Sequence, residues 1–550
     1  MRLPSNRRER HDLYRDLLRR CDVSRDDRRE RYRRLRLAYL NGSPDGATVR
    51  SNRLARHVRW SSSYLFAPDS VRWGVVLPPH YGEEWLGELS AAREELTRLW
   101  HDSDAGGTAN MCVRWAHVYD TIIAKVIVSE DEPKLYMVSD TSDVGVLDEA
   151  IHEWDRQEAL CHWFTVDLAT FQRMVSVLPD VERRIKLLEY AAQHSTRPGG
   201  AEGHTLPPTL ERVLIAASTP NMIGVARAAA DTTIASPHSD EPVIQLAELW
   251  VRDDEAREWR VATFLVPESI IWDPLNPLNP GEHPFHELQL DPTPGYAWGK
   301  APLTDLIPLQ EWREQKIADL DEREGRQIDP PAFFKGFATV DGEKAKLFRR
   351  RGGTIATNVP NAEVQMFSPP PLPEPFSMVH EIDSEFAQDG DLPRSLMGQA
   401  DPGGAQSRDP MAQAALGSGP TLVKAMLVES WLQDIATAQL RLHRRISGRT
   451  IKKATGSEFL LAQMPADVIA RVWAHSASPL YAQQVLQKAL IANERGAIDN
   501  EDLLLYLDLP MTEALLHKQR HLAEAKAKEH ERAISIKEQE AKAKVLRAVK

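Results

Sequence analysis

The sequence predicts an α+β protein, and three stretches carry that prediction. Residues 303–324 and 373–388 both have helical patterns, and the segment between them is rich in β-formers, basic residues and glycine. Two runs that alternate as strands do, 243–251 and 258–266, flank a five-residue turn and predict a β-hairpin. Residues 421–446 repeat apolar side chains with a period of 3.6, which predicts one long helix.

Length and composition exclude several classes of protein. A chain of 550 residues is long enough for two to four domains with large cores, and 42% hydrophobic and 27% charged residues are ordinary values. Its longest apolar runs are about five residues, far below the ~18 needed to span a bilayer, and no secretory signal opens the chain. The three cysteines at 21, 112 and 161 have no paired spacing. We therefore expect no membrane partner, no disulfide framework and a reducing interior.

Charge is segregated along the chain. The net charge is −12, but residues 1–60 hold 18 Arg against eight acids, a net of +10, so the other 490 residues carry −22. A basic end of this kind suits an arm that binds nucleic acid. Alternation of Arg with acids over 25–31 suits a solvated helix with i,i+4 pairs, which we favour. Both interpretations stay open at this point.

The remaining elements follow from local patterns. Helices are expected over 5–40, 83–101 and 167–193, and strands over 112–128 and 134–139. Turns or loops are expected at 41–49, 196–209, 273–295 (a proline-rich connection) and 398–420. The C-terminal part is expected to be helical, with Asp499 as an N-cap, and 511–550 to form an exposed helix or tail.

Motifs for catalysis are missing. No phosphate-binding loop with Gly-Lys-Ser/Thr and no Gly-x-Ser-x-Gly elbow occurs, and His152-Glu153 and His380-Glu381 each lack the second His of a zinc helix. Cys161-His162, with His152 nearby, could begin a metal site, but such a pair beside Trp163 is more typical of a core. The sequence therefore predicts neither an enzyme nor a metal or cofactor site, and favours a binding or structural role.

The two helical legs and the segment between them form the main candidate site. The first leg, 303–324, is 22 residues or roughly 33 Å long. Residues expected to pack the legs are Leu306, Leu309, Trp312, Phe376, Val379, Ile382 and Phe386. Two amphipathic helices of an ordinary α/β protein would show the same pattern, but the small basic segment between them is less usual.

Charges alternate along this site. Residues 311–326 hold six acids and four basic residues, residues 374–391 hold six acids and no Lys or Arg, and residues 332–367 hold six basic residues and three acids. The acids singled out on the legs are Glu311, Glu314, Asp319, Glu322, Glu381, Asp383 and Glu385. The basic residues between the legs are Lys335, Lys344, Lys346, Arg349, Arg350 and Arg351.

The entry to the first leg resembles a known family. The segment Tyr296-Ala-Trp-Gly-Lys-Ala-Pro-Leu303, followed by Leu306, Pro308, Leu309 and Gln310, is similar to the start of the first stem helix of tailed-bacteriophage portal proteins. Ala301 stands where that family often has Ser. Asp329-Pro-Pro331, Leu396-Met-Gly398, residues 54–66 and residues 496–503 resemble further family segments in the same order. The order along the chain carries more weight than any single motif.

The resemblance implies a portal-like fold with a mixed α/β wing, a two-helix stem, a small α/β clip and a helical crown, assembled as a ring. It divides the chain into an Arg-rich N-terminal helical segment (1–40), a wing (41–295), a first stem helix (296–326), a clip (327–372), a second stem helix (373–397), a tunnel loop (398–410), a long wing helix (411–446) and a crown with a charged tail (447–550).

The resemblance also implies a function. Family members form a ring, usually of twelve copies, at one capsid vertex, and double-stranded DNA enters and leaves through the axial channel. The implied partners are further copies of the chain, DNA, the major capsid protein, the terminase large subunit, a head–tail adaptor and a scaffold protein. The implied location is the virion, after synthesis in the host cytoplasm. The alternatives are another ring-forming adaptor or tail protein and a DNA-packaging enzyme with an unrecognised site.

Two hypotheses on DNA contact follow. Acidic legs around a channel would repel phosphate and let DNA slide, whereas the basic residues of the clip would grip DNA or contact terminase. A solvated hairpin edge explains the Arg run equally well. The tunnel loop could contact DNA through Gln399, Gln406, Ser407 and Arg408, or serve only as a connector. A break at 417–420 leaves a second place for that loop.

Overall fold

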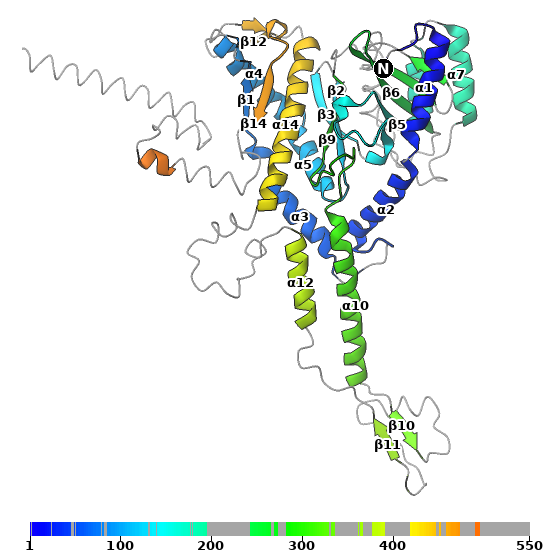
Figure 1. Ribbon diagram of the computed structural model, residues 1–550, viewed down its shortest axis with the longest axis vertical. Helices are drawn as coiled ribbons and strands as arrows, with labels where there is room; N and C mark the ends of the chain where they lie inside the picture. Colours follow the sequence, from blue (N-terminus) through cyan, green and yellow to red (C-terminus); the bar gives the residue numbers. More distant parts are fainter. Residues whose placement is uncertain are drawn as a thin grey trace, which may run out of the picture. The chain divides into compact units, whose positions relative to one another are not determined.

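The computed structural model describes residues 1–194, 243–328, 332–335, 361–366, 377–390, 419–472 and 490–495, apart from short gaps within these ranges (Figure 1). The chain divides into two compact units, Met1–Ala477 and Ser478–Lys550. Of the second unit only a helical turn at 490–494 and the residue after it are described. The rest of the fold described below belongs to the first unit, which mixes helices with several small sheets and confirms the α+β class.

The largest sheet among the described residues has five antiparallel strands in the order β4-β5-β6-β7-β8 and belongs to the first unit. Its strands are β4 (Val144–Val146), β5 (Ala159–Asp167), β6 (Val243–Asp253), β7 (Glu258–Leu265) and β8 (Ser269–Trp272). β6 and β7 pair from Leu246 with Leu265 to Asp253 with Glu258, so the predicted hairpin is confirmed. Both strands are almost fully buried because the sheet is covered on both faces.

The N-terminal segment covers one face of this sheet. It forms two helices, α1 (Arg7–Asp22) and α2 (Arg25–Asn41), and the Asn6 side chain caps α1 by accepting a hydrogen bond from the Arg8 amide. Alternate residues of β5 point to opposite faces, so Cys161 and Trp163 pack against Tyr14 and Leu17 of α1. The helical prediction for 5–40 is confirmed as two helices, the first ending at Asp22 and the second beginning at Arg25.

The solvated-helix interpretation of this segment is wrong for two arginines. Arg25 is buried, lies 4.4 Å over the Trp163 ring and pairs with Asp143 at 2.7 Å. Arg28 is buried against Trp298 at 3.9 Å. A guanidinium is weakly hydrated and stacks well on an indole, which makes its burial tolerable.

A three-stranded sheet, β3-β2-β9, faces the other side of β5. Its strands are β2 (Ile122–Ser129), β3 (Glu132–Met137) and β9 (Phe285–Leu288). Two predictions are corrected here. Residues 112–116 belong to a helix, α5 (Ala105–Ala116), and the proline-rich stretch 273–295 contains β9, which pairs with β2.

A buried ion pair joins the two sheets. Lys125 of β2 donates hydrogen bonds to Glu248 of β6 at 2.9 Å and to Nδ1 of His162 of β5 at 2.8 Å, and all three residues are fully buried. The neutral imidazole accepts from the ammonium because burial, and then the Lys125 charge, hold the pKa of His162 well below its usual range. Cys161 and His162 are therefore core residues, as the sequence favoured.

Helices cover the rest of the first unit. They are α3 (Arg53–Leu65), α4 (Leu86–Asp102), α6 (Leu168–Ser176), α7 (Val181–His194) and α14 (Gly419–Ile446), with short 3-10 turns at Pro68–Ser70, Thr141–Asp143, Trp154–Arg156 and Leu461–Gln463. α14 lies against β3, β9 and β14 (Figure 1), and its apolar stripe is buried, as the 3.6 period predicts.

The helical prediction for 447–550 is wrong over 450–472. That stretch forms β12 (Thr450–Lys452), β13 (Glu458–Leu460) and β14 (Ile469–Val472). β12 pairs with β13, whereas β14 pairs with β1 (Trp73–Val76), almost 400 residues earlier in the chain. These strands are part of the first unit. Among the helices within the described ranges, none has the length and hydrophobicity that crossing a membrane requires.

Candidate functional site

The predicted first leg begins at a tight turn whose glycine has no room for a side chain. A Cβ on Gly299 would lie 2.7 Å from the Asp120 carbonyl oxygen and 2.8 Å from that of Asp291, and backbone atoms cannot swing aside. The Gly299 amide donates to Thr121 Oγ1 at 3.1 Å, and Ala301 two residues later is buried. Close packing thus accounts for the Gly-x-small-Pro-Leu pattern at this entry.

Replacing Gly299 by Ala tests this account. We expect Gly299→Ala to lower the free energy of unfolding by about 1–3 kcal/mol, because the backbone must move to relieve the overlap. Chemical denaturation of the full chain measures the change. Gly295→Ala is a comparison with a different cause of strain, because nothing lies within 4 Å of a Cβ there but its φ of 70° disfavours any side chain. A Gly299 variant as stable as the wild type would contradict the account.

The first leg is a continuous helix, α10 (Leu303–Ile328), of 26 residues or about 39 Å. Leu303 and Leu306 are buried at its start, and Pro308 lies inside the helix with its ring exposed. The second leg is α12 (Ser377–Asp389), with Val379, Ile382 and Phe386 buried. Both helical predictions are confirmed by these elements.

Contacts with α3 show that α10 and α12 form an antiparallel hairpin. Gln310, near the start of α10, accepts from the Arg53 amide at 3.2 Å and donates to the Ser51 carbonyl at 3.0 Å. The C-terminal end of α12 lies at α3 as well, because Phe386 and Gly390 contact His57. One leg therefore leaves α3 and the other returns to it, side by side in Figure 1.

An ion network fixes the hairpin to α3. The Asp383 carboxylate accepts from Arg313 of α10 and from Arg53 of α3, both at 2.9 Å. Asp383 is 16% exposed, Arg313 9% and Arg53 27%, so the network is largely shielded from water. Burial lowers the pKa of the Arg53 guanidinium, and the Asp383 charge opposes that effect.

The predicted acidic residues fall into two groups. Glu311, Asp319, Glu322 and Glu381 are exposed, whereas Glu314, Asp383 and Glu385 are half-buried. Glu314 pairs with Arg313 at 3.3 Å and Asp319 with Lys316 at 3.7 Å. The exposed group adds four carboxylates to the surface of the hairpin.

Two of the predicted packing residues are not buried within the single chain. Trp312 of α10 is 36% exposed, and Leu309 is half-buried. Met378 of α12, which the sequence argument did not single out, is 45% exposed. Phe376 lies outside the described residues.

Between the legs the chain forms an antiparallel pair, β10 (Ala332–Lys335) and β11 (Glu363–Met366), which starts four residues after α10 ends. Lys335 is exposed on β10. Residues that lie outside the described ranges are Lys344, Lys346, Arg349, Arg350 and Arg351 of the predicted clip and Gln399, Gln406, Ser407 and Arg408 of the predicted tunnel loop.

Comparison with known proteins does not assign the chain to a family. The chain matches no family model, and no curated protein matches it. Two similar solved structures come from a gene transfer agent: a chain of the virion of the native particle and a chain of the neck of an empty particle computed with C6 symmetry. Both are 10% identical with a TM-score of 0.40; the first match covers 87% of this chain and 94% of that one, and the second 86% and 92%. Similarity at this level assigns neither fold nor function to the chain.

Proposed function

We propose that the chain is a portal subunit: copies assemble into a ring at one capsid vertex, and double-stranded DNA passes through the central channel during packaging and ejection. The observation that carries the proposal is the α10–α12 hairpin with a β-pair between its legs, anchored on α3 through Gln310 and Asp383. The sequence resemblance at 296–310, with its order of further motifs, supports the same assignment.

Exposed apolar side chains on the hairpin support association with further copies. A two-helix hairpin cannot bury both faces of each helix, and here Trp312 and Met378 remain 36% and 45% exposed. Aromatic and Met side chains are enriched in protein interfaces. Neighbouring hairpins in a ring would cover them and would hold the helices around an axis.

The acidity of the hairpin suits a channel through which DNA slides. Tight, non-specific DNA binding needs Lys and Arg to replace the counterions on phosphate. Glu311, Glu322 and Glu381 present the opposite charge to solvent. A ring of such hairpins would offer DNA few places to stick, so a separate motor could move it without breaking strong contacts at each step.

Electron microscopy of the purified full-length protein tests the proposed function. We expect closed rings with a central opening wide enough for a DNA duplex, and a narrower projection made by the hairpins in side views. Mass photometry of the same sample counts the copies, which the resemblance puts at about twelve. A protein that stays a monomer at every concentration and salt tested would overturn the proposal.

Removing the acidic charges tests the sliding argument. We expect the triple variant Glu311→Gln, Glu322→Gln and Glu381→Gln to bind linear duplex DNA roughly tenfold more tightly at low salt than the wild type, with the difference disappearing as salt screens the charges. Fluorescence anisotropy with labelled DNA measures it. The matched control replaces Glu94, Glu182 and Glu189, three exposed glutamates on α4 and α7, by Gln. Equal gains in both variants would show a general charge effect and refute the argument.

A further inference from the structure

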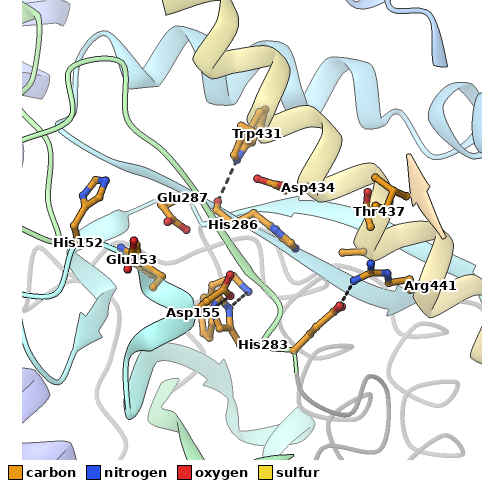
Figure 2. A pocket seen from close by; sticks show the side chains of 15 residues that line it. His152, Glu153, Asp155, His283, His286, Glu287, Trp431, Asp434, Thr437 and Arg441 are labelled. Atoms are coloured by element: carbon orange, nitrogen blue, oxygen red, sulfur yellow. Dashed lines mark hydrogen bonds and ion pairs between the residues drawn. The ribbon is translucent and has the colours of Figure 1, made fainter. Parts of the chain in front are cut away.

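A separate cavity of about 480 Å³ lies between α14 and β9, with the turn Trp154–Arg156 at its side (Figure 2). Its lining is unusually rich in carboxylates. The acids are Glu153, Asp155, Glu282, Glu287 and Asp434, against a single basic side chain other than histidine, Arg441. Only Glu153 belongs to a motif in the sequence, the His152-Glu153 pair, and the five acids come from stretches far apart along the chain.

Three of the five carboxylates already have partners. Glu282 pairs with Arg441, Glu153 pairs with Arg156 at 2.6 Å, and Asp155 lies 3.1 Å from Nε2 of His283. Figure 2 draws the first and the third of these pairs as dashed lines, with Arg441 on α14. The charge of these three groups is therefore at least partly balanced within the chain.

Glu287 of β9 and Asp434 of α14 are different. Neither forms an ion pair with a residue that the structure describes. Burial raises the pKa of Glu287 to about 8 and that of Asp434 to about 6, and the Asp155 charge adds to both effects. Glu287 is half-buried and Asp434 is exposed, so a cation that enters the cavity can reach both carboxylates, and a positive charge beside them would favour their ionised forms.

The lining favours an organic cation over a metal ion. Within the described part of the chain, no three His, Cys, Asp or Glu side chains come close enough together to hold a metal. Trp431 stands in the wall, and its indole is held by a 3.2 Å hydrogen bond from Nε1 to the His286 carbonyl. Nε2 of His286 is buried with no hydrogen-bond partner among the described residues. An aromatic wall beside two carboxylates without ion-pair partners among the described residues suits the flat, weakly hydrated guanidinium of arginine.

The chain itself carries a matching set of arginines. Residues 1–60 have a net charge of +10, and α1 and α2 expose five arginines that form no ion pair with a described residue: Arg7, Arg8, Arg19, Arg20 and Arg34. We propose that the cavity between α14 and β9 binds an arginine side chain from the α1–α2 segment of a second copy of this chain. The proposal rests on the self-association put forward above and names one contact that would maintain it.

Removing the two unpaired carboxylates is the direct test. We expect the double variant Glu287→Gln and Asp434→Asn to raise the protein concentration at which half of the chains are assembled by at least about tenfold, measured by mass photometry. Its unfolding temperature at low concentration should match or exceed that of the wild type, because neither carboxylate forms an ion pair with a described residue that the substitution would break. The matched control is Glu94→Gln with Glu189→Gln, which removes the same charge from exposed sites.

The reciprocal variant tests the occupant. Replacing Arg7, Arg8, Arg19, Arg20 and Arg34 by Gln should weaken assembly to a similar degree, and combining it with the cavity variant should add little. If the cavity variant assembled at the same concentration as the wild type, or if the control pair weakened assembly equally, the cavity would be ruled out as the site. Unchanged assembly by the arginine variant would overturn α1–α2 as its source. A wild type that never assembles would instead overturn the proposed function.

Discussion

Replacing Lys125 by Met is expected to lower the free energy of unfolding by roughly 3–5 kcal/mol, the range seen when one partner of a buried ion pair is removed. Lys125 and Glu248 are fully buried with 2.9 Å between Nζ and Oε2, and the other carboxylate oxygen of Glu248 has no partner among the described residues. Without the ammonium, Glu248 must either keep an uncompensated charge in the core or take up a proton. The pair also joins the three-stranded sheet to the five-stranded one. We therefore expect the first unit of Lys125→Met to unfold in a single transition, at a lower urea concentration than the wild type.

The double variant Lys125→Met with Glu248→Leu separates the two contributions. Removing both charges leaves no unpaired ion, so most of the lost stability should return. Urea denaturation of the full chain, followed by far-UV circular dichroism, gives the three values needed. A Lys125→Met protein within 1 kcal/mol of the wild type would show that the buried pair contributes little, and failure of the double variant to recover would point to packing rather than charge.

Elements set by their own local pattern were predictable. The β6–β7 hairpin was predictable because two runs of β-forming residues flank a short turn, and α14 because its apolar residues repeat with a period of 3.6. The α10 start was predictable for another reason, since Gly299 and Pro302 set the backbone there directly.

Elements whose form depends on partners far away in the sequence were not predictable from local patterns. Residues 112–116 alternate like a strand, but the helix α5 is stabilised by burying Cys112, Val113 and Ala116 against α3, α4 and the three-stranded sheet. β9 follows four of the prolines of the stretch 273–295 and exists because β2 offers it an edge. Strands of only three or four residues, such as β12 and β14, are too short to show a period.

The same distinction holds for charged residues. The burial of Arg25 and Arg28 depends on Trp163 and Trp298, which lie more than a hundred residues away in sequence. Asp383 was counted as one of several acids on the second leg, but Arg53, 330 residues earlier, makes it the centre of an ion network. Charge counts along the sequence indicate which segments are acidic and cannot tell a solvent-facing carboxylate from one that fixes two helices to a third.

The ion network of Asp383, Arg53 and Arg313 predicts which part of the hairpin unfolds first. In Asp383→Ala, the Arg313 and Arg53 guanidinium groups stay close together with no carboxylate between them, and Arg313 is only 9% exposed. We expect the free energy that holds α12 on α10 and α3 to fall by about 2–4 kcal/mol. This is somewhat less than for a fully buried pair, because Arg53 is partly solvated. An isolated helix of 13 residues, the length of α12, is marginal in water, so α12 should detach from α10 before the sheets unfold.

Hydrogen–deuterium exchange of the full chain measures this local opening. We expect amides of α12 in Asp383→Ala to exchange at least tenfold faster than in the wild type, while those of β5 and β6 stay protected. Glu381→Ala is the matched control, because it removes an exposed carboxylate two residues earlier on the same helix and leaves the network intact. Equal exchange in the two variants would refute the anchoring role of Asp383. Faster exchange in Asp383→Ala alone, together with loss of the projection from side views of the rings, would connect the anchor on α3 to the proposed channel.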